Sequence, residues 1–328
     1  MTQRFLVTGG AGYVGSHLVA ALLDRGDSVT VIDNLRTGHE AAVPTPARLV
    51  VADLGDGAAL DAVMQDGSWD AVFHFASLSQ VGESMRMPMR YLLENAANGI
   101  RLIDACVRHG VERFVLSSTA ALFNVDSDAP IPEDAPIDPQ SAYGDSKWMI
   151  ERALRWAHQV HGLRPACLRY FNAAGADPAG RLGEDHRPES HLIPLVIDAA
   201  LGRRAALDVF GDDYSTPDGT CIRDYVHVSD LATAHLCAVE ALQERPVTWN
   251  LGNGAGHSVR QVIAAVERVS GLKVPYRVVG RRSGDAAVLV ASSARAQQAG
   301  WRPMHGDLDD IVATAFAWRK LHPDGYGD

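Results

Sequence analysis

A glycine-rich segment near the start of the chain limits the folds open to it more than any other feature. Phe5-Leu6-Val7 is a short apolar run, a glycine-rich turn follows it, and residues 16–23 then show helical apolar spacing. A strand, a tight glycine turn and a helix in this order let the backbone approach a pyrophosphate at the positive end of the helix. The segment therefore predicts a dinucleotide-binding unit, with three motif glycines at its turn: Gly9, Gly12 and Gly15.

The apolar runs that follow alternate with helical patterns. This alternation predicts an α/β fold with a doubly wound parallel sheet of the Rossmann type. The runs are residues 4–8, 28–32, 48–51, 71–76, 113–116 and 165–170, and the longest helices are expected at 91–109 and 143–161. The pattern changes after Asn172, and residues 223–227 read as a strand that returns to the sheet. We expect residues 1–172 plus about 223–249 to form the dinucleotide-binding domain, and about 173–222 plus 250–328 a smaller C-terminal α/β substrate domain.

An acidic residue ends the second predicted strand. Asp33 follows Gly15 at close to the roughly 20-residue spacing at which an acid holds the adenosine ribose hydroxyls. A carboxylate there favours NAD over NADP, although nearby Arg36 leaves NADP open. Asp53-Leu54 follows the third strand and could lie along the edge of the adenine, although Asp53 alone would be no more than a turn residue.

Polar side chains follow two later strands, at the sheet edge where ligands bind in such folds. Residues 77–84 are expected to form a polar loop after the fourth strand, and Ser117-Ser118-Thr119 follows the fifth. A hydroxyl there is able to bond a substrate oxygen, but local turns and helix caps use hydroxyls more often. His74 lies inside an apolar run and reads as a core histidine.

Tyr143 and Lys147 are four residues apart at the start of a predicted helix, so they are expected on one face. A base that works near neutrality needs a cation beside a tyrosine, whose unperturbed pKa is about 10. Solvated helices often carry the same spacing, so its meaning depends on the rest of the chain.

Composition narrows the partners. A formal net charge of −10 argues against binding a nucleic-acid backbone. Four cysteines without a C-x-x-C pair fit a reducing compartment. No apolar leader or membrane-spanning run is visible, and a cytoplasmic protein is expected. His158 and His161 share a helix face without a third ligand, so no metal is expected.

The chain resembles the extended short-chain dehydrogenase/reductase family and, within it, the UDP-glucose (UDP-galactose) 4-epimerases. The glycine turn, the hydroxyl triplet and the Tyr-Lys pair carry the family resemblance. Further segments carry the resemblance to the epimerases, and they span nearly the whole chain: His74-Phe75-Ala76, Val81-Gly82-Glu83-Ser84, Arg169-Tyr170-Phe171-Asn172, Phe210-Gly211-Asp212-Asp213-Tyr214, Asp218-Gly219-Thr220, Arg223-Asp224-Tyr225-Val226-His227, Asn250-Leu251-Gly252 and Arg281-Arg282-x-Gly284-Asp285.

The resemblance implies a role for each matching position. It implies Tyr143 as the base, Lys147 as the residue that holds the nicotinamide ribose and lowers the tyrosine pKa, and Thr119 as a hydroxyl that bridges to the sugar. Besides these, it implies NAD contacts from Gly9, Gly12, Tyr13, Val14, Gly15, Asp33, Asn34, Asp53, Leu54, Phe75, Ala76, Ser77, Ser79, Asn95 and Phe171. The UDP-hexose substrate would meet Asn172, Leu192, Phe210, Arg223, Arg282, Asp285 and Leu289.

Three positions depart from the family pattern. Thr119 stands where many members have serine; it keeps the donor and acceptor but restricts χ1. Ser79 replaces a lysine of some epimerases, which removes one cation near the cofactor. Leu289 occupies a sugar-pocket position that is tyrosine in some relatives and smaller in others, so it leaves sugar specificity open.

The implied reaction oxidises the sugar at C4, turns the 4-keto sugar over and reduces it on the other face. The alternatives are an epimerase of UDP-N-acetylhexosamines or UDP-pentoses, a nucleotide-sugar dehydratase or decarboxylase, and a non-catalytic NAD sensor. Ala120-Ala121 follows Thr119 where dehydratases have an acid/base pair, which disfavours dehydration. The resemblance also implies a homodimer through the helices at 91–109 and 142–161.

Overall fold

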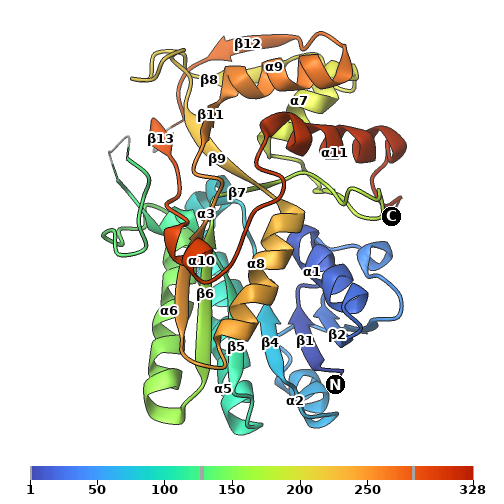
Figure 1. Ribbon diagram of the computed structural model, residues 1–328, viewed down its shortest axis with the longest axis vertical. Coiled ribbons are helices and arrows are strands. Elements are labelled where there is room, and N and C mark those ends of the chain that lie inside the picture. The colour runs from blue at the N-terminus through green and yellow to red at the C-terminus, as the bar shows by residue number, and fades with distance from the viewer. Residues whose placement is uncertain (1, 126–128, 283–284, 328) are drawn as a thin grey trace.

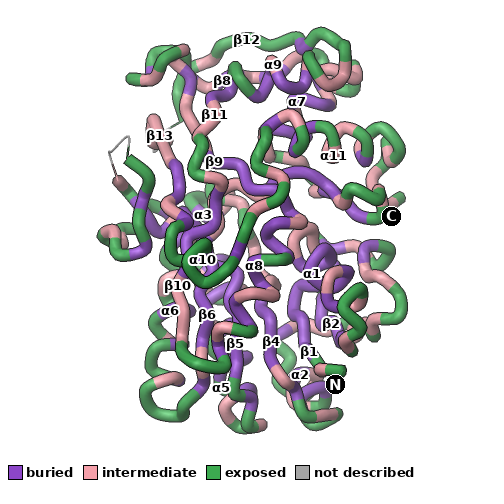
Figure 2. Tube along the Cα trace, in the orientation of Figure 1, coloured by how far each residue is buried: buried purple, intermediate pink, exposed green. Residues whose placement is uncertain are grey.

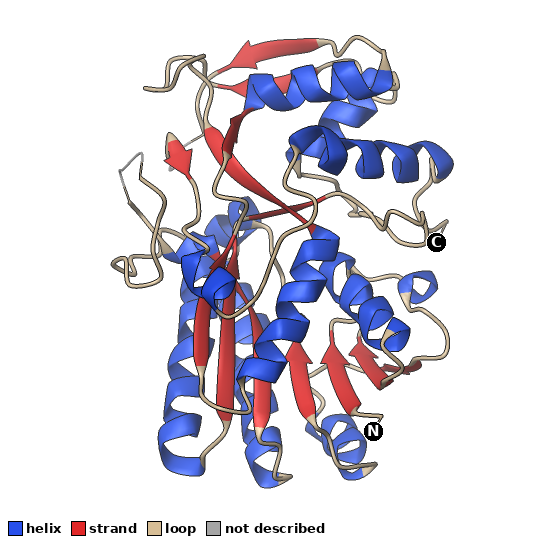
Figure 3. Cartoon of the chain, viewed as in Figure 1, coloured by secondary structure: helices blue, strands red, loops and turns tan. Residues whose placement is uncertain are grey.

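The computed structural model describes residues 2–125, 129–282 and 285–327. A seven-stranded parallel sheet forms its larger part, in the order β10-β6-β5-β4-β1-β2-β3 (Figure 3). The strands are β1 (Arg4–Thr8), β2 (Ser28–Asp33), β3 (Arg48–Val51), β4 (Ala71–His74), β5 (Arg113–Thr119), β6 (Arg164–Tyr170) and β10 (Val247–Leu251). The expected doubly wound parallel sheet is confirmed.

Both faces of this sheet are buried because side chains alternate along each strand. On β1, Phe5 and Val7 pack into one hydrophobic cluster with α1 and α8, whereas Leu6 packs into the other with α2, α5 and α6 (Figure 1). Most of these strands are accordingly buried along most of their length, whereas the edge strand is partly exposed (Figure 2). The helices are α1 (Tyr13–Asp24), α2 (Gly57–Gln65), α5 (Asn98–Arg108), α6 (Ala142–His161) and α8 (Val228–Ala241).

The strand order reverses between β1 and β4, and ligands of open α/β sheets bind outside the carboxyl edge at such a point. The glycine turn after β1 and the loop after β4 lie here, because Thr8 is in register with His74. At the same edge, Thr119 of β5 is in register with Tyr170 of β6. The hydroxyl triplet thus belongs to β5 itself, which is longer than the apolar run indicated.

A smaller part of the molecule has its own core above this edge (Figure 1). β9 pairs with β7, β11 and β13, and β8 pairs with β12. Three helices pack on these strands. The elements are β7 (Asn172–Ala174), α7 (Leu192–Ala200), β8 (Leu207–Phe210), β9 (Ile222–His227), β11 (Gly256–Ser258), α9 (Val259–Ser270), β12 (Tyr276–Val279), β13 (Val288–Leu289) and α11 (Leu308–Leu321).

Residues 223–227 correct one expectation. They lie in β9, which joins the smaller sheet, and β10 instead supplies the seventh strand of the large sheet. The apolar pattern identified a strand but not its partner, because pairing is decided by tertiary contacts. α10 (Ala294–Gln298) also returns to the large part: Ala296 lies in its core, and Trp301 donates to the Asp230 carbonyl of α8 at 3.0 Å. The expected domain limits remain a prediction.

The predicted helix at 91–109 and the predicted loop at 77–84 are both only partly right. The first region divides into α4 (Pro88–Tyr91), a π-helical turn η2 (Leu92–Ala97) and α5. The second gives way to α3 (Val81–Arg86) halfway along. The 3₁₀ turns are η1 (Glu40–Ala42) and η3 (Ala120–Leu122). Single π turns inside helices often mark functional sites, and η2 contains Asn95.

Candidate active site

The three motif glycines lack a side chain for two different reasons. Gly9 has a φ of +74°, and an added Cβ would lie 2.3 Å from the Ala76 nitrogen. A Cβ on Gly15 would lie 2.2 Å from the Gly9 carbonyl oxygen. A Cβ on Gly12, the N-cap of α1, would meet nothing closer than 3.4 Å. The fold itself needs the first and third glycines, whereas the second leaves room at a helix N-terminus that fits a diphosphate.

Asp33 ends β2 at the same edge, as expected. Its carboxylate oxygens accept the backbone N–H groups of Ala11 at 3.0 Å and Leu35 at 2.9 Å. Burial raises the pKa of Asp33, and these hydrogen bonds work in the opposite direction. The bonds fix the acid beside the glycine turn, and each oxygen keeps a second lone pair for a ribose hydroxyl.

Asp53 lies next to Asp33's strand end and is tied to its neighbours. It accepts Asn34 Nδ2 at 2.8 Å, and it forms an ion pair with Arg36 at 3.3 Å. The hydrogen bond from Asn34 is the main reason why the pKa of Asp53 is lowered. Arg36 also pairs with Glu94 at 2.8 Å. Arg36, the cation that could have bound the 2′-phosphate of NADP, is therefore already paired with two carboxylates. Leu54 is buried in the core.

Asn95 shapes the loop after β4. Its side chain is fully buried; it accepts Leu78 N–H at 2.8 Å and donates to the Leu78 carbonyl at 2.9 Å and to Ser146 Oγ at 3.1 Å. These bonds join η2, the loop and α6. The predicted cofactor residues Phe75, Ala76 and Ser77 lie half-buried along this loop and Ser79 is exposed.

Tyr143 and Lys147 lie on consecutive turns at the start of α6. Ser141 caps the helix, because its Oγ accepts the Gly144 N–H at 3.1 Å. Lys147 is 1% exposed, and its ammonium donates to the Ser117 carbonyl of β5 at 2.9 Å. The helical spacing predicted from the sequence thus places both side chains at the sheet edge next to the hydroxyl triplet.

The pKa of Tyr143 differs from the expectation. Burial raises it, and a side-chain hydrogen bond with Thr119 opposes that rise. Burial likewise lowers the pKa of Lys147 to about 7, although the charge of Glu151 favours the ammonium. Burial therefore dominates the pKa of both groups, and the Lys147 ammonium is itself desolvated and donates to a carbonyl. That the lysine lowers the tyrosine pKa remains a prediction.

The hydroxyl expected beside the base is in place. Thr119 is 8% exposed, and its Oγ1 accepts the Ala121 N–H at 3.1 Å. Ser117 Oγ and the Tyr170 hydroxyl form a short hydrogen bond one strand away. The edge of Tyr91 packs against the Tyr143 ring. Tyr143 and Thr119 therefore present two hydroxyls together at one point of the sheet edge.

A buried ion pair under the site was missed by the sequence analysis. Glu151, one turn after Lys147, binds Arg169 through two bonds of 3.0 and 2.6 Å and accepts Ser118 Oγ at 2.6 Å. Both charged side chains are almost fully buried. The four-residue spacing from Lys147 was a possible signal for Glu151, but helical spacing does not reveal depth. The pair locks α6 to β5 and β6 and so positions the residues above it.

The residues expected on the substrate side form two groups in the smaller part. Arg223 Nη2 lies 3.5 Å from Asp285, and Leu289 is in register with Arg223 across β13 and β9. Arg282 lies over the Phe210 ring, 3.9 Å from its centroid. Gly284 lies outside the described residues. Asn172 begins β7 and is in register with Tyr225 of β9, the strand that carries Arg223, and Leu192 begins α7.

Comparison with known proteins places this geometry in a family. A family model described as "NAD dependent epimerase/dehydratase family" matches residues 5–252. The chain belongs to this family. It is 47% identical to a UDP-glucose 4-epimerase of Halalkalibacterium halodurans over 99% of this chain and 98% of the relative. No helix in the described residues is long and apolar enough to cross a bilayer.

Two solved structures of family members extend the comparison. A crystal structure of a UDP-glucose 4-epimerase superposes with a TM-score of 0.96 at 45% identity and covers 99% of each chain. Another, the Bifidobacterium longum UDP-glucose 4-epimerase in complex with NAD⁺ and UDP, has a TM-score of 0.94 at 35% identity, covering 98% of this chain and all of the other. The fold of this family member is thus that of the epimerases.

One side-chain cluster was also missed. The sequence analysis considered His158, but its Nδ1 faces the Leu163 backbone carbonyl at 3.1 Å. Instead, four ligand-type residues gather in the loop before α7: Glu184, His186, Glu189 and His191. Their crowding within eight residues was the available signal, and only the folded loop shows that their donor atoms converge.

Proposed function

We propose that the protein interconverts UDP-glucose and UDP-galactose as an NAD-dependent 4-epimerase. The observation that carries this proposal is the 47% identity to a UDP-glucose 4-epimerase across nearly the full length of both chains. The joined hydroxyls of Tyr143 and Thr119, beside a buried lysine and a glycine turn, support it from the geometry.

NAD fits the groups present. The room at Gly12 and the N-terminus of α1 suit its diphosphate, and Asp33 suits its adenosine ribose. Lys147 would hold the nicotinamide ribose, and the loop after β4 that Asn95 fixes would line the nicotinamide. When bound, NAD takes up the hydride from C4 of the sugar and gives it back.

Tyr143 moves the proton in this proposal. Its phenolate accepts the proton of the sugar 4-hydroxyl as C4 is oxidised, and returns it to the same oxygen after the 4-keto sugar has turned over. Thr119 bridges the phenol and the sugar oxygen, which orients the proton transfer. Because burial favours the neutral phenol of Tyr143, its ionisation requires positive charge nearby that stabilises the phenolate.

The uridine diphosphate would be held by the smaller part, and the hexose loosely enough to turn. Two arginines, Arg223 and Arg282, suit a diphosphate because a guanidinium pairs two phosphate oxygens. Arg223 Nη1 already donates to the Ile222 and Ala286 carbonyls at 2.8 and 2.9 Å, which fixes its direction. Leu289 sits next to it, half-buried, and would face the sugar.

The test is turnover of UDP-galactose by the purified chain without added NAD. We expect epimerisation with no net oxidant, and a loss of most turnover in Tyr143→Phe with the fold intact. Tyr91→Phe is the matched control, since it removes a buried hydroxyl that donates to Glu83 at 2.7 Å and leaves the base in place. A requirement for a stoichiometric oxidant would overturn the epimerase reading.

Sugar preference separates the alternatives. If Leu289 limits the space at the sugar, the rate on UDP-N-acetylgalactosamine should fall below the rate on UDP-galactose. A UDP-pentose is smaller than either and should still enter. Equal kcat/KM on the first two would move the assignment to a broader 4-epimerase. Release of a 4-keto-6-deoxy sugar would instead indicate a dehydratase, which Ala120-Ala121 disfavours. A non-catalytic NAD sensor would be unaffected by Tyr143→Phe.

We further propose a cytoplasmic homodimer that pairs through the α5/α6 side of the sheet. Large apolar side chains are exposed there, on neighbouring elements: Leu93 (65%), Ile100 (46%), Met149 (41%), Trp156 (57%) and Val160 (66%). Such a patch marks an interaction surface, and this one coincides with the two helices that the family resemblance implies. The four free cysteines support a reducing compartment.

A further inference from the structure

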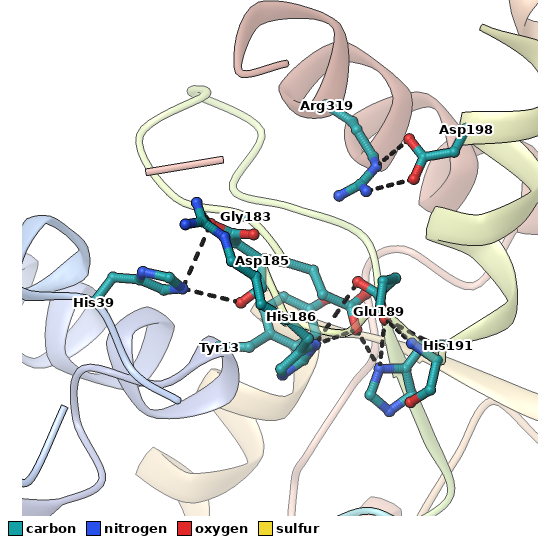
Figure 4. A network of polar contacts seen from close by, with 12 residues as sticks. Tyr13, His39, Gly183, Asp185, His186, Glu189, His191, Asp198 and Arg319 are labelled. Carbon is teal, nitrogen blue, oxygen red and sulfur yellow. Dashed lines mark hydrogen bonds and ion pairs between the residues drawn. The ribbon is translucent and has the colours of Figure 1, made fainter. Parts of the chain in front are cut away.

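The loop between β7 and α7 brings together four side chains that the proposed reaction does not use. One donor atom from each of Glu184, His186, Glu189 and His191 lies within 4.8 Å of all the others, and Figure 4 shows His186, Glu189 and His191 turned toward one another. We propose that these four residues bind one divalent transition-metal ion, and that Zn²⁺ matches them best.

The spacing of the donor atoms fits a four-coordinate ion. Glu184 Oε1 lies 3.2 Å from His186 Nδ1 and 2.7 Å from His191 Nδ1. Glu189 lies 3.3 Å from His191 through Oε1 and 3.9 Å from His186 through Oε2. A tetrahedral ion with bonds of about 2.0–2.1 Å holds its ligand atoms roughly 3.3–3.4 Å apart. The observed separations lie on both sides of that value, so small side-chain shifts complete the site.

Hydrogen bonds account for only part of the arrangement: Glu189 Oε1 accepts the backbone N–H groups of Ser190 and His191 at 2.8 and 2.9 Å. Four atoms of the cluster are buried without a hydrogen-bond partner in the described residues: Glu184 Oε1, His186 Nδ1, Glu189 Oε2 and His191 Nδ1. The two glutamate side chains are only 7% and 8% exposed. The close contacts therefore have ion-pair distances but not the directions of N–H···O bonds. Lone pairs that face a common centre are what a metal ion requires, and buried polar atoms without partners are otherwise costly.

The charge of the cluster also calls for a cation. Glu184 and Glu189 place two carboxylates in a buried loop. The arginines nearby already have partners, since Arg319 pairs with Asp198 through two bonds.

A divalent ion would neutralise both carboxylates at once. Two imidazole nitrogens with two carboxylate oxygens are a ligand set of Zn²⁺ and its neighbours. Mg²⁺ and Ca²⁺ prefer oxygen ligands throughout, so the imidazoles argue against them.

The position of the cluster suggests what the ion would do. His191 is the N-cap of α7, directly before Leu192, and His186 packs edge-on against Tyr13 at the start of α1. Tyr13 in turn donates to the Gly175 carbonyl at 2.6 Å. An ion here would close residues 184–191 into a fixed loop between α1 and α7. It would stabilise the fold and position both helix starts, without taking part in the hydride chemistry.

Metal binding by the full-length chain, without an affinity tag, tests the proposal. The chain is first dialysed against a chelator and then titrated with Zn²⁺ by calorimetry, with Mg²⁺ as a negative control. We expect one Zn²⁺ per chain and a rise in Tm on binding. Glu184→Gln and His191→Asn should weaken binding by at least about a hundredfold. Glu112→Gln and His161→Asn, which change exposed residues of the same types, should leave it unchanged.

Two results would overturn the proposal: no stoichiometric Zn²⁺ binding by the wild-type chain, or equal binding by the cluster variants and the controls. If circular dichroism shows that the cluster variants do not fold, Co²⁺ bound to the wild-type chain decides. The strong visible absorption of a four-coordinate Co²⁺ ion supports the site, and its absence rejects it.

Discussion

Replacing Gly12 by alanine separates the cofactor-binding role of the glycine turn from its structural role. Gly12 has a φ of −82° and a ψ of 172°, which alanine adopts without strain, and an added Cβ meets nothing closer than 3.4 Å. The smaller entropy of the unfolded chain stabilises such a variant by about 0.4–1 kcal/mol, and the poorer N-cap offsets a few tenths or more. The free energy of unfolding without NAD should therefore change by less than about 1 kcal/mol.

NAD binding should respond far more strongly to the same methyl group. If the diphosphate occupies the room at Gly12, the Cβ prevents its approach to the backbone N–H groups of α1. Hydrogen bonds to charged groups contribute about 1.5–3 kcal/mol, so losing one weakens NAD binding roughly 10- to 100-fold. Two measurements report the weaker NAD binding. One is the NAD content of the purified protein, released by denaturation and quantified by chromatography, and the other is the shift of Tm on adding NAD.

Gly15→Ala is the matched comparison within the same turn. Its Cβ would lie 2.2 Å from the Gly9 carbonyl oxygen, more than an ångström too close, so the turn or α1 must move. Overpacking of this kind costs roughly 1–3 kcal/mol or more, and the loss should appear in unfolding without NAD. Wild-type NAD content in Gly12→Ala would refute the placement of the diphosphate at this turn. Wild-type stability in Gly15→Ala would refute the packing argument.

Three further predictions concern the rest of the molecule. Burial lowers the pKa of four histidines to about 3 or 4: His17, His74, His227 and His235. The unfolded chain therefore binds more protons than the folded chain below pH 6.5, and stability falls as the pH falls. The free energy of unfolding, measured in urea, should fall between pH 7.5 and 5.5 by about 1.4 kcal/mol less in His235→Gln than in the wild type. An equal fall in both proteins would contradict the lowered pKa of His235. Glu151→Gln should cost about 3–5 kcal/mol of stability because it leaves Arg169 buried and unpaired, whereas Ser118→Ala should cost clearly less; equal costs would argue against the ion pair as the element that holds α6. Trp156→Glu should halve the mass measured by sedimentation while Leu321→Glu, exposed at the far end of α11, should not, and a monomeric wild type would exclude the proposed dimer.

The parts of the fold that the sequence predicted well depend on short-range periodicity. The strands of the parallel sheet read as apolar runs, and β1 and β3 begin and end where those runs do. The four-residue spacing of Tyr143 and Lys147 fixes a common helix face whatever the helix packs against. Two of the fold-level errors involve choices that local pattern does not make: which sheet β9 joins, and where a π turn interrupts the helix before α5.

The sequence predicted which residues of the candidate site lie close together, but it did not predict their electrostatics. Sequence spacing and resemblance identified Tyr143, Lys147 and Thr119, and the structure brings all three to one sheet edge. The sequence did not indicate that Lys147 is buried or that Tyr143 is half-buried. Burial reverses the expected direction of the tyrosine pKa, because a charge taken out of water is disfavoured whichever residue carries it.

Positioning residues act through partners that are distant along the chain or through a folded loop. The sequence analysis missed Glu151 and predicted Asn95 only as an NAD contact. Glu151 gains its role from Arg169 and Ser118 on two different strands, and Asn95 gains its role from a loop and from α6. In both cases the polar side chain can be buried only because hydrogen-bonding partners on other elements are in place. The sequence around either residue alone does not show those partners. The proposed catalytic pair depends on these contacts: the helix that carries Tyr143 and Lys147 is held at its first turns by Asn95 and one turn later by Glu151. Changes at the positioning residues should therefore alter the geometry of the proposed base as well as stability, although neither positioning residue is proposed to contact the sugar.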